Sequence, residues 1–295
     1  MGKAESPARW IAAELNGSAL TLQVIGLQGE VLGEASERHV VSSASLEAAL
    51  LRLAESWLGT ATVPVLLAGA PGQWWEQELR AVPCTPLPAS GLARLTASDP
   101  RLAIYPVPGL RQARPVDLMQ GDETRIAGAL ALWPQFDGVI CLPGAETRWA
   151  HVSAGEVVSF QTSISGALMG WVTGDPAYRG SFARHAEGDG FEIAVSETLS
   201  RPERVAARLY SLHAEAVLGA PSAAAGARLK GYILGMELAG ARPYWLGQEV
   251  VLIGDAALCG DYARALALQG VQTRVLEAKA CSLAGLSTLV PQILR

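Results

Sequence analysis

The first seventy residues alternate between apolar and polar positions in a way that predicts a sheet. Residues 20–24 alternate strictly, which is typical of a half-buried strand, and the Asn16-Gly17 dipeptide before them favours a tight hairpin turn. Residues 31–41 can return as a third strand. Helical spacing follows over 45–57, with Ser45 as the expected N-cap, and the apolar segment 63–69 predicts a buried strand.

A similar order of elements returns in the second half of the chain. A buried strand is expected at 138–144, followed by a hairpin of 147–153 with 156–163 and a helix at 165–172. Later elements are expected as helices at 200–218, 223–239, 261–269 and 283–289, with strands at 249–255 and 271–278. Hairpin, third strand, helix and strand thus occur twice, without a close sequence repeat.

The duplicated order predicts two related α/β domains of actin-like (ribonuclease H-like) architecture, with mixed sheets flanking a nucleotide cleft. We place the N-terminal domain at 1–114 and the C-terminal domain at 115–295. A doubly wound Rossmann fold is the alternative, but it needs strands alternating singly with helices, and no GxGxxG follows the first strand.

The stretch 115–130, PVDLMQGDETRIAGAL, carries two adjacent acids at the start of an apolar helix. Asp122 and Glu123 can serve chemistry, as a proton acceptor or as a contact of metal-bound water. They can also simply complement the positive end of the helix dipole. Asp117, just upstream, competes for the catalytic role.

Composition and charge narrow the classes of protein that remain. The chain has 295 residues, half of them hydrophobic, and a net charge of −5 without a basic stripe, which argues against a nucleic-acid partner. No apolar run reaches the roughly 18 residues of a membrane helix, and no signal-peptide core is visible. Four scattered cysteines without a CxxC indicate reduced thiols, so we expect a cytoplasmic protein.

Several strings, taken in order, resemble the 2-dehydro-3-deoxygalactonokinase family of actin-like sugar-acid kinases. The resemblance extends over nearly the whole chain, and the strings are PGLRQARPVDLMQGDETRIAGAL, ICLPGAETRWAHVSAGEVVSFQTSISGALMGWV, RLKGYILGMELAGA and VVLIGDAALCGDYARALALQGV. Glycines and apolar positions of the family pattern are kept, whereas several polar side chains differ. The changed positions include Glu14, Gln120, Asp122, Arg148 and Ala167, where the family pattern has Asp, Arg, Glu, Lys and Glu.

The resemblance implies ATP and Mg²⁺ as cofactors and assigns roles to individual residues. The expected cofactor contacts are Glu14, which would also hold the metal, with Gly17, Ser18, Gly144, Thr147, Gly254 and Asp255. The expected catalytic groups are Asp122, Glu123 and Asp117. The expected substrate contacts are Arg111, Arg125, Arg148, Trp149 and Gly166. For Asp255 a simple helix cap is the alternative, and Glu237 is interpreted as a surface or hinge residue.

The implied activity is ATP-dependent phosphorylation of 2-dehydro-3-deoxy-D-galactonate to its 6-phosphate, a step of D-galactonate catabolism. The expected partners are therefore the sugar acid and ATP, with a homodimer as a candidate assembly. Two alternatives stay open because polar motif positions have changed. The protein could be a non-catalytic or weakly active ligand-binding relative, or a kinase retuned to another sugar acid.

Overall fold

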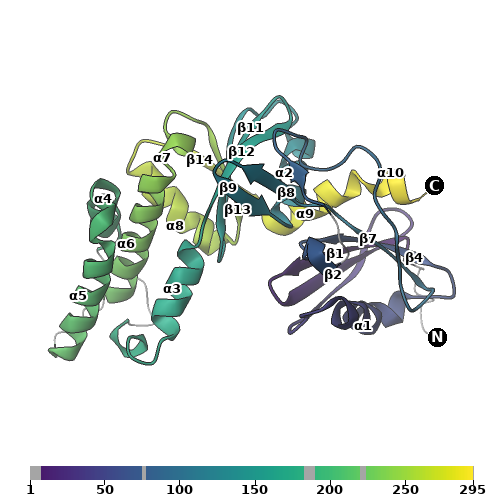
Figure 1. Ribbon diagram of the computed structural model, residues 1–295, viewed down its shortest axis with the longest axis horizontal. Coiled ribbons are helices and arrows are strands. Elements are labelled where there is room, and N and C mark those ends of the chain that lie inside the picture. Colours follow the sequence, from purple (N-terminus) through teal and green to yellow (C-terminus); the bar gives the residue numbers. More distant parts are fainter. Residues whose placement is uncertain (1–7, 75–77, 183–189, 220–223, 295) are drawn as a thin grey trace. The chain divides into compact units, whose positions relative to one another are not determined.

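The computed structural model describes residues 8–74, 78–182, 190–219 and 224–294, which form two compact α/β units (Figure 1). Unit 1 comprises residues 1–135 together with 279–295, and unit 2 comprises residues 136–278. The domain boundary predicted from the sequence lies earlier, at 114/115, and assigns the C-terminal segment to the second domain.

Unit 1 is built on a mixed six-stranded sheet with the strand order β3-β2-β1-β4-β7-β6. The first three strands are antiparallel, while β1, β4 and β7 run parallel to one another. A second sheet has the order β5-β8-β9. The strands are β1 (Trp10–Asn16), β2 (Ala19–Ile25), β3 (Val31–Glu37), β4 (Val63–Ala68), β5 (Arg80–Ala81), β6 (Leu95–Thr96), β7 (Leu102–Pro106), β8 (Leu110–Ala113) and β9 (Val116–Met119).

The helices of unit 1 cover the six-stranded sheet. They are α1 (Ser43–Ala54), α2 (Asp122–Leu132), α9 (Ala278–Ser287) and α10 (Val290–Ile293), with 3-10 turns at Glu55–Trp57 and Gly72–Trp74. The N-cap expected at Ser45 is wrong by three residues. Ser42 caps α1, and Ser45 completes a capping box because its hydroxyl accepts from the Ser42 backbone N–H.

Helices α2 and α9 approach each other so closely that only glycine fits at their contact. A Cβ on Gly128 would lie 1.8 Å from the Cys281 carbonyl oxygen, and one on Gly285 would lie 2.0 Å from the Thr124 carbonyl oxygen. The last helices also bury Leu286 and Leu289 in a core with strands of the first sheet. This packing explains why the compact unit includes α2 and the C-terminal segment. The sequence boundary itself remains a prediction.

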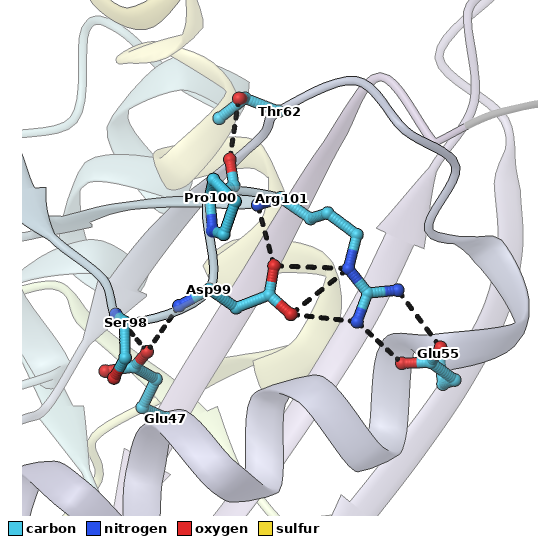
Figure 2. Close-up of polar contacts among 7 residues, drawn as sticks. All are labelled: Glu47, Glu55, Thr62, Ser98, Asp99, Pro100 and Arg101. Atoms are coloured by element: carbon cyan, nitrogen blue, oxygen red, sulfur yellow. Dashed lines mark hydrogen bonds and ion pairs between the residues drawn. The ribbon is translucent and has the colours of Figure 1, made fainter.

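The turn before β7 is fixed by polar contacts to the neighbouring helix (Figure 2). Glu47 of α1 accepts from the Asp99 backbone N–H at 3.2 Å. Arg101 pairs with Asp99 at 2.9 Å and with Glu55 at 3.0 Å. The hydrogen bonds from Arg101 hold the pKa of Asp99 below its ordinary value. Because these groups are near the surface, we assign them local ordering of the turn rather than large stabilisation.

Unit 2 repeats the arrangement of a hairpin followed by parallel strands. Its sheet has the order β12-β11-β10-β13-β14, with β10, β13 and β14 parallel. The strands are β10 (Gly138–Leu142), β11 (Thr147–Ser153), β12 (Glu156–Ser163), β13 (Val250–Gly254) and β14 (Thr273–Glu277). The helices are α3 (Ser165–Gly174), α4 (Phe191–Ser200), α5 (Val205–Val217), α6 (Ala225–Gly240), α7 (Arg242–Trp245) and α8 (Ala256–Ala267), with 3-10 turns at Arg179–Ser181 and Pro202–Arg204.

The helix expected across 200–218 is divided in the structure. Helix α4 ends at Ser200, and Pro202 begins a short 3-10 turn before α5, because a proline cannot continue the hydrogen-bond ladder of a preceding helix. The pattern did not reveal α4 itself, which buries Phe191 and Val195. Within the described residues, no helix is long and apolar enough to cross a membrane.

Helices α4 and α6 also meet at glycines. A Cβ on Gly231 would lie 2.5 Å from the Phe191 carbonyl oxygen, and a Cβ on Gly235 would lie 2.4 Å from the Val195 carbonyl oxygen. The two glycines are four residues apart and therefore share one face of α6. They allow the helix backbones to approach more closely than any larger side chain would permit.

This contact predicts opposite effects for two glycine-to-alanine changes in helices. Gly235→Ala should lower the free energy of unfolding, because overpacking typically costs about 1–3 kcal/mol and outweighs the gain of roughly 1 kcal/mol in helix propensity. Gly260→Ala in α8 is the matched control: nothing lies within 4 Å of its added methyl group, so it should stabilise. Urea unfolding of both variants measures the difference, and equal stabilities would contradict the packing argument.

Candidate active site

Two carboxylates that are distant in sequence meet around one guanidinium in unit 1. Arg125, on the first turns of α2, donates to Asp122 Oδ1 at 2.9 Å and forms an ion pair with Glu14 Oε1 near the end of β1. Ser282 of α9 donates to the other oxygen of Glu14 at 2.9 Å. Burial by itself would lower the pKa of Arg125, but the charges of Glu14 and Asp122 outweigh it and raise that pKa. The cluster therefore keeps a permanent positive charge between its acids.

Glycines shape the backbone beside this cluster. Gly121, directly before α2, has φ +102° and its Cα approaches Gly69 at the end of β4. Gly69 in turn lies against β1, since a Cβ there would be 2.2 Å from the Leu15 carbonyl oxygen. The start of α2 is thereby held against the ends of β1 and β4, which is why Asp122 and Glu14 come together.

The two adjacent acids of the helix start have different environments. Both oxygens of Glu123 accept from the Gly121 backbone N–H, at 2.9 and 2.7 Å, and the side chain is fully buried. Glu123 thus secures the turn before α2, as the capping interpretation predicts. Asp122 is 8% exposed and contacts Arg125. Of the pair, Asp122 is the better placed for chemistry.

The other predicted site residues of unit 1 lie on the hairpins. Gly17 and Ser18 form the exposed turn between β1 and β2, and Gly17 has φ +60° with open space around it. Asp117 lies on β9, where its carboxylate accepts from the Leu118 backbone N–H at 2.7 Å. Arg111 lies exposed on β8 and its Nε donates to the Leu79 carbonyl oxygen at 3.2 Å.

In unit 2, three predicted glycines surround one turn. A Cβ on Gly166, in the first turn of α3, would lie 2.1 Å from the Gly144 carbonyl oxygen. The Ala167 backbone N–H donates to Ala145 O at 2.8 Å. Gly254 ends β13, and a Cβ there would lie 3.3 Å from the Pro143 carbonyl oxygen. The structure therefore brings Gly144, Gly166 and Gly254 together around residues 143–145.

Several predicted contacts of this turn are engaged inside the protein. Asp255 caps α8 by accepting from the Ala257 and Leu258 backbone N–H groups at 3.0 and 3.1 Å, as its alternative interpretation predicts. Thr147 is fully buried, and its hydroxyl lies 2.8 Å from the Tyr262 hydroxyl. It is thus placed to hold the turn rather than to reach a ligand.

Arg148 and Trp149, which were expected at the substrate, are also buried inside unit 2. Arg148 is 8% exposed and pairs with Glu146 at 2.6 Å. The ring of Trp149 is fully buried in the core of unit 2, so it has no free face for stacking. Its indole N–H donates to Glu237 at 2.9 Å.

The interpretation of Glu237 as a surface or hinge residue is wrong. The side chain is 4% exposed on α6 and accepts hydrogen bonds from Trp149 and Tyr262. A sequence signal existed, because Glu237 lies next to the buried Leu238 and four residues after the buried Ile233, in the apolar second half of the helix. An acid in such a position is buried only when donors surround it.

A small cavity of about 50 Å³ opens beside the glycine turn of unit 2. Gly144 and Gly166 line it on one side and Met169, Ile233 and Leu258 add apolar surface. The ion pair of Lys230 with Asp261, at 2.7 Å, lies at the same cavity. Ligand pockets usually measure roughly 300–1,000 Å³, so this hollow beside the glycine turn can take only a fragment of a ligand.

The donor set around Glu14 does not fit a resident Mg²⁺. Mg²⁺ asks for free carboxylate oxygens in octahedral geometry, but Arg125 and Ser282 already occupy the two oxygens of Glu14. Within residues 8–74, 78–182, 190–219 and 224–294, no group of three or more His, Cys, Asp or Glu side chains is placed to share a metal ion. The predicted metal role of Glu14 would require the loss of its ion pair with Arg125.

Known proteins are similar to this chain in fold and, along most of its length, in sequence. A curated protein of Rhizobium meliloti (strain 1021), assigned as a 2-dehydro-3-deoxygalactonokinase, is 29% identical, and the match covers 94% of this chain and 95% of that protein. The crystal structure of a Sinorhizobium meliloti protein with the same assignment is similar with a TM-score of 0.84 and 28% identity, covering 96% of each chain.

A more distant similarity concerns the fold alone. Component A of (R)-2-hydroxyglutaryl-CoA dehydratase from Acidaminococcus fermentans is 10% identical with a TM-score of 0.51, covering 94% of this chain and 95% of that one. With the kinase structure above, it confirms the expected α/β class with two actin-like domains on mixed sheets.

The family itself is shown by a match along most of the sequence. The family model described as 2-keto-3-deoxy-galactonokinase covers residues 17–289, which include every predicted site residue except Glu14. The chain therefore belongs to the 2-keto-3-deoxy-galactonokinase family.

Proposed function

We propose that the protein transfers the γ-phosphoryl group of ATP to the 6-hydroxyl of 2-dehydro-3-deoxy-D-galactonate. Family membership supports the sugar-kinase class, and the names of the relatives supply the substrate. The observation that carries the proposal is the Glu14–Arg125–Asp122 cluster, which holds a carboxylate and a fixed positive charge together. Phosphoryl transfer depends mainly on such positioning and charge stabilisation.

In the proposed reaction, Asp122 accepts the proton of the attacking hydroxyl. The hydroxyl oxygen forms the new bond to the γ-phosphorus, the bond from that phosphorus to the β–γ bridging oxygen breaks, and ADP leaves. Arg125 orients Asp122 through Oδ1, and Glu14 orients Arg125. Glu123 keeps the start of α2 in place through Gly121.

The remaining roles follow from which groups are accessible. Arg111 is exposed and a guanidinium suits a carboxylate, so Arg111 is the proposed contact of the substrate carboxylate. In unit 1, Gly17 and Ser18 are proposed to present backbone N–H groups to phosphate. In unit 2, the turn at residues 144–145 is proposed to contact phosphate, with the Gly144 N–H itself bonded to Thr147, and the small cavity beside the turn to take part of the nucleotide. Mg²⁺ enters as part of the MgATP substrate, because the acids around Arg125 do not form a resident metal site.

The direct test is turnover with purified protein. We expect ADP release with 2-dehydro-3-deoxy-D-galactonate and MgATP, with a 6-phosphate ester as the product by phosphorus NMR. The epimer at C4 is the matched comparison, since it keeps the carboxylate and the terminal hydroxyl. Faster turnover of the epimer would favour a kinase retuned to another sugar acid. Absence of turnover with all sugar acids tested would favour the non-catalytic alternative.

The roles of the adjacent acids are separable by two conservative variants. Asp122→Asn should reduce turnover by about 10²–10⁴-fold, the usual effect of removing a general base, with a nearly unchanged melting temperature. Glu123→Gln should lower the melting temperature and affect turnover much less, because it weakens the hydrogen bonds to Gly121. The assignment fails if Asp122→Asn retains near-normal turnover.

The absence of a resident metal site predicts how Mn²⁺ should bind. In electron paramagnetic resonance titrations without nucleotide, the wild type should leave Mn²⁺ free, while Arg125→Gln should bind it because Glu14 and Asp122 lose their shared cation. Arg148→Gln is the control, since Arg148 pairs with Glu146 and lies in unit 2, outside the cluster of Glu14, Arg125 and Asp122. Tight Mn²⁺ binding by the nucleotide-free wild type would contradict the prediction.

A further inference from the structure

A buried carboxylate lies behind the glycine turn of unit 2, and the proposed reaction does not use it. Glu237 Oε1 accepts from Trp149 Nε1 at 2.9 Å, and Oε2 accepts from the Tyr262 hydroxyl at 2.9 Å. The hydroxyls of Ser163 and Ser165 also hydrogen-bond to it. All four partners are uncharged, and because the Ser163 and Ser165 hydroxyls lie 2.7 Å apart, one of the two serines donates to the other. Burial is the largest influence and raises the pKa of Glu237 above its ordinary value, although the four hydrogen bonds act in the opposite direction.

The hydrogen bonds of the Tyr262 and Thr147 hydroxyls, which lie between Glu237 and the turn, have a fixed donor-to-acceptor direction. Tyr262 gives its only hydroxyl proton to Glu237, and burial followed by the nearby Glu237 raises the pKa of Tyr262, so this proton stays in place. The bond between Thr147 and Tyr262, at 2.8 Å, must then use the proton of Thr147. The Thr147 oxygen is left as an acceptor, and the Gly144 backbone N–H donates to it at 3.4 Å.

This series of hydrogen bonds has a donor at each of its two ends, so one group within the series must act only as an acceptor. The Gly144 backbone N–H and the Trp149 indole N–H can only donate. Every group between them is satisfied when Glu237 is a carboxylate and each hydroxyl points toward it. A neutral amide at this position has only one accepting oxygen, so the Tyr262 hydroxyl must turn toward Thr147 and the direction of these hydrogen bonds is reversed.

A second route leads from Glu237 to the same turn. Ser165 is 4% exposed, begins α3 and lies 2.7 Å from the Ser163 hydroxyl. The next residue, Gly166, presses against the Gly144 carbonyl oxygen. The backbone of residues 144–145 is therefore held from one side through Thr147 and from the other through the start of α3.

We propose that Glu237 is a positioning residue that sets the orientation of the Gly144–Ala145 backbone through Tyr262 and Thr147 and through Ser165. Its effect on nucleotide affinity rests on the proposed function, in which this turn contacts phosphate. Its effect on the orientation of the turn does not depend on the proposed function. Glu237 touches neither substrate in this proposal and acts only through the hydrogen-bonded side chains.

Isosteric variants test each link by calorimetry with a non-hydrolysable ATP analogue and by steady-state kinetics. Tyr262→Phe and Thr147→Val interrupt the series of hydrogen bonds, and Glu237→Gln removes the carboxyl group at which the series ends. Each should weaken nucleotide affinity about tenfold or more and raise KM for ATP, with KM for the sugar acid unchanged. Thr147→Ser keeps the hydroxyl and should restore near wild-type affinity. Glu237→Gln and Tyr262→Phe interrupt the same series of hydrogen bonds. Their effects on nucleotide affinity should therefore be clearly non-additive.

Thr198→Val is the matched control. Thr198 of unit 2 is buried and its hydroxyl donates to the Ala194 carbonyl oxygen, so it takes no part in the hydrogen bonds that lead to Glu237. It should affect stability alone. A merely structural role of Glu237 predicts equal changes of both KM values, additive effects and no rescue by Thr147→Ser. Any of these results in folded variants would overturn the proposal.

Hydrogen exchange without any ligand separates this inference from the proposed function. Glu237→Gln, Tyr262→Phe and Thr147→Val should accelerate exchange in the peptide spanning 143–149, relative to α8 and to Thr198→Val. If the wild type binds no nucleotide, the proposed function fails, and accelerated exchange still supports the role of Glu237 in the turn. Unchanged exchange in all three variants would overturn that role, whatever the nucleotide result.

Discussion

Backbone lying directly against backbone, at positions where no side chain fits, is the constraint on which the rest of the structure depends. In unit 1, Gly69 brings the end of β4 against Leu15, while Gly128 and Gly285 bring α2 against α9. In unit 2, Gly166 brings α3 against the turn at Gly144. Each contact fixes an element that carries a site residue, so the glycines determine where the polar groups lie.

The two units stabilise buried acids in different ways. In unit 1 a single guanidinium compensates Glu14 and Asp122, and the resulting cluster has its own fixed cation. In unit 2 uncharged donors surround Glu237. An ion pair of the first kind supplies charge where phosphoryl transfer needs it, whereas directed hydroxyls of the second kind supply geometry.

This difference bears on how polar changes in the family pattern should be interpreted. A carboxylate that is paired with Arg125 acts as an orienting group, so Glu14 need not hold a metal for the proposed reaction to proceed with MgATP. Likewise, Thr147 and Trp149 are fully buried and hydrogen-bond to Tyr262 and Glu237, so the role proposed for them is to support the turn from inside the protein. Gly17, Ser18 and Arg111 are exposed, and in the proposed function they contact the substrates together with Asp122.

The sequence by itself determined the two α/β halves, the hairpin at Asn16-Gly17 and the helix beginning at Asp122, because periodicity and turn chemistry are local properties. It also pointed to the glycines of the site. Only the tertiary structure decided which polar groups are partners. Glu14 and Arg125 are 111 residues apart, and Trp149 and Glu237 are 88 apart. No local pattern encodes such pairs, since packing of distant elements decides whether an acid caps a helix, pairs with an arginine or lies buried among donors.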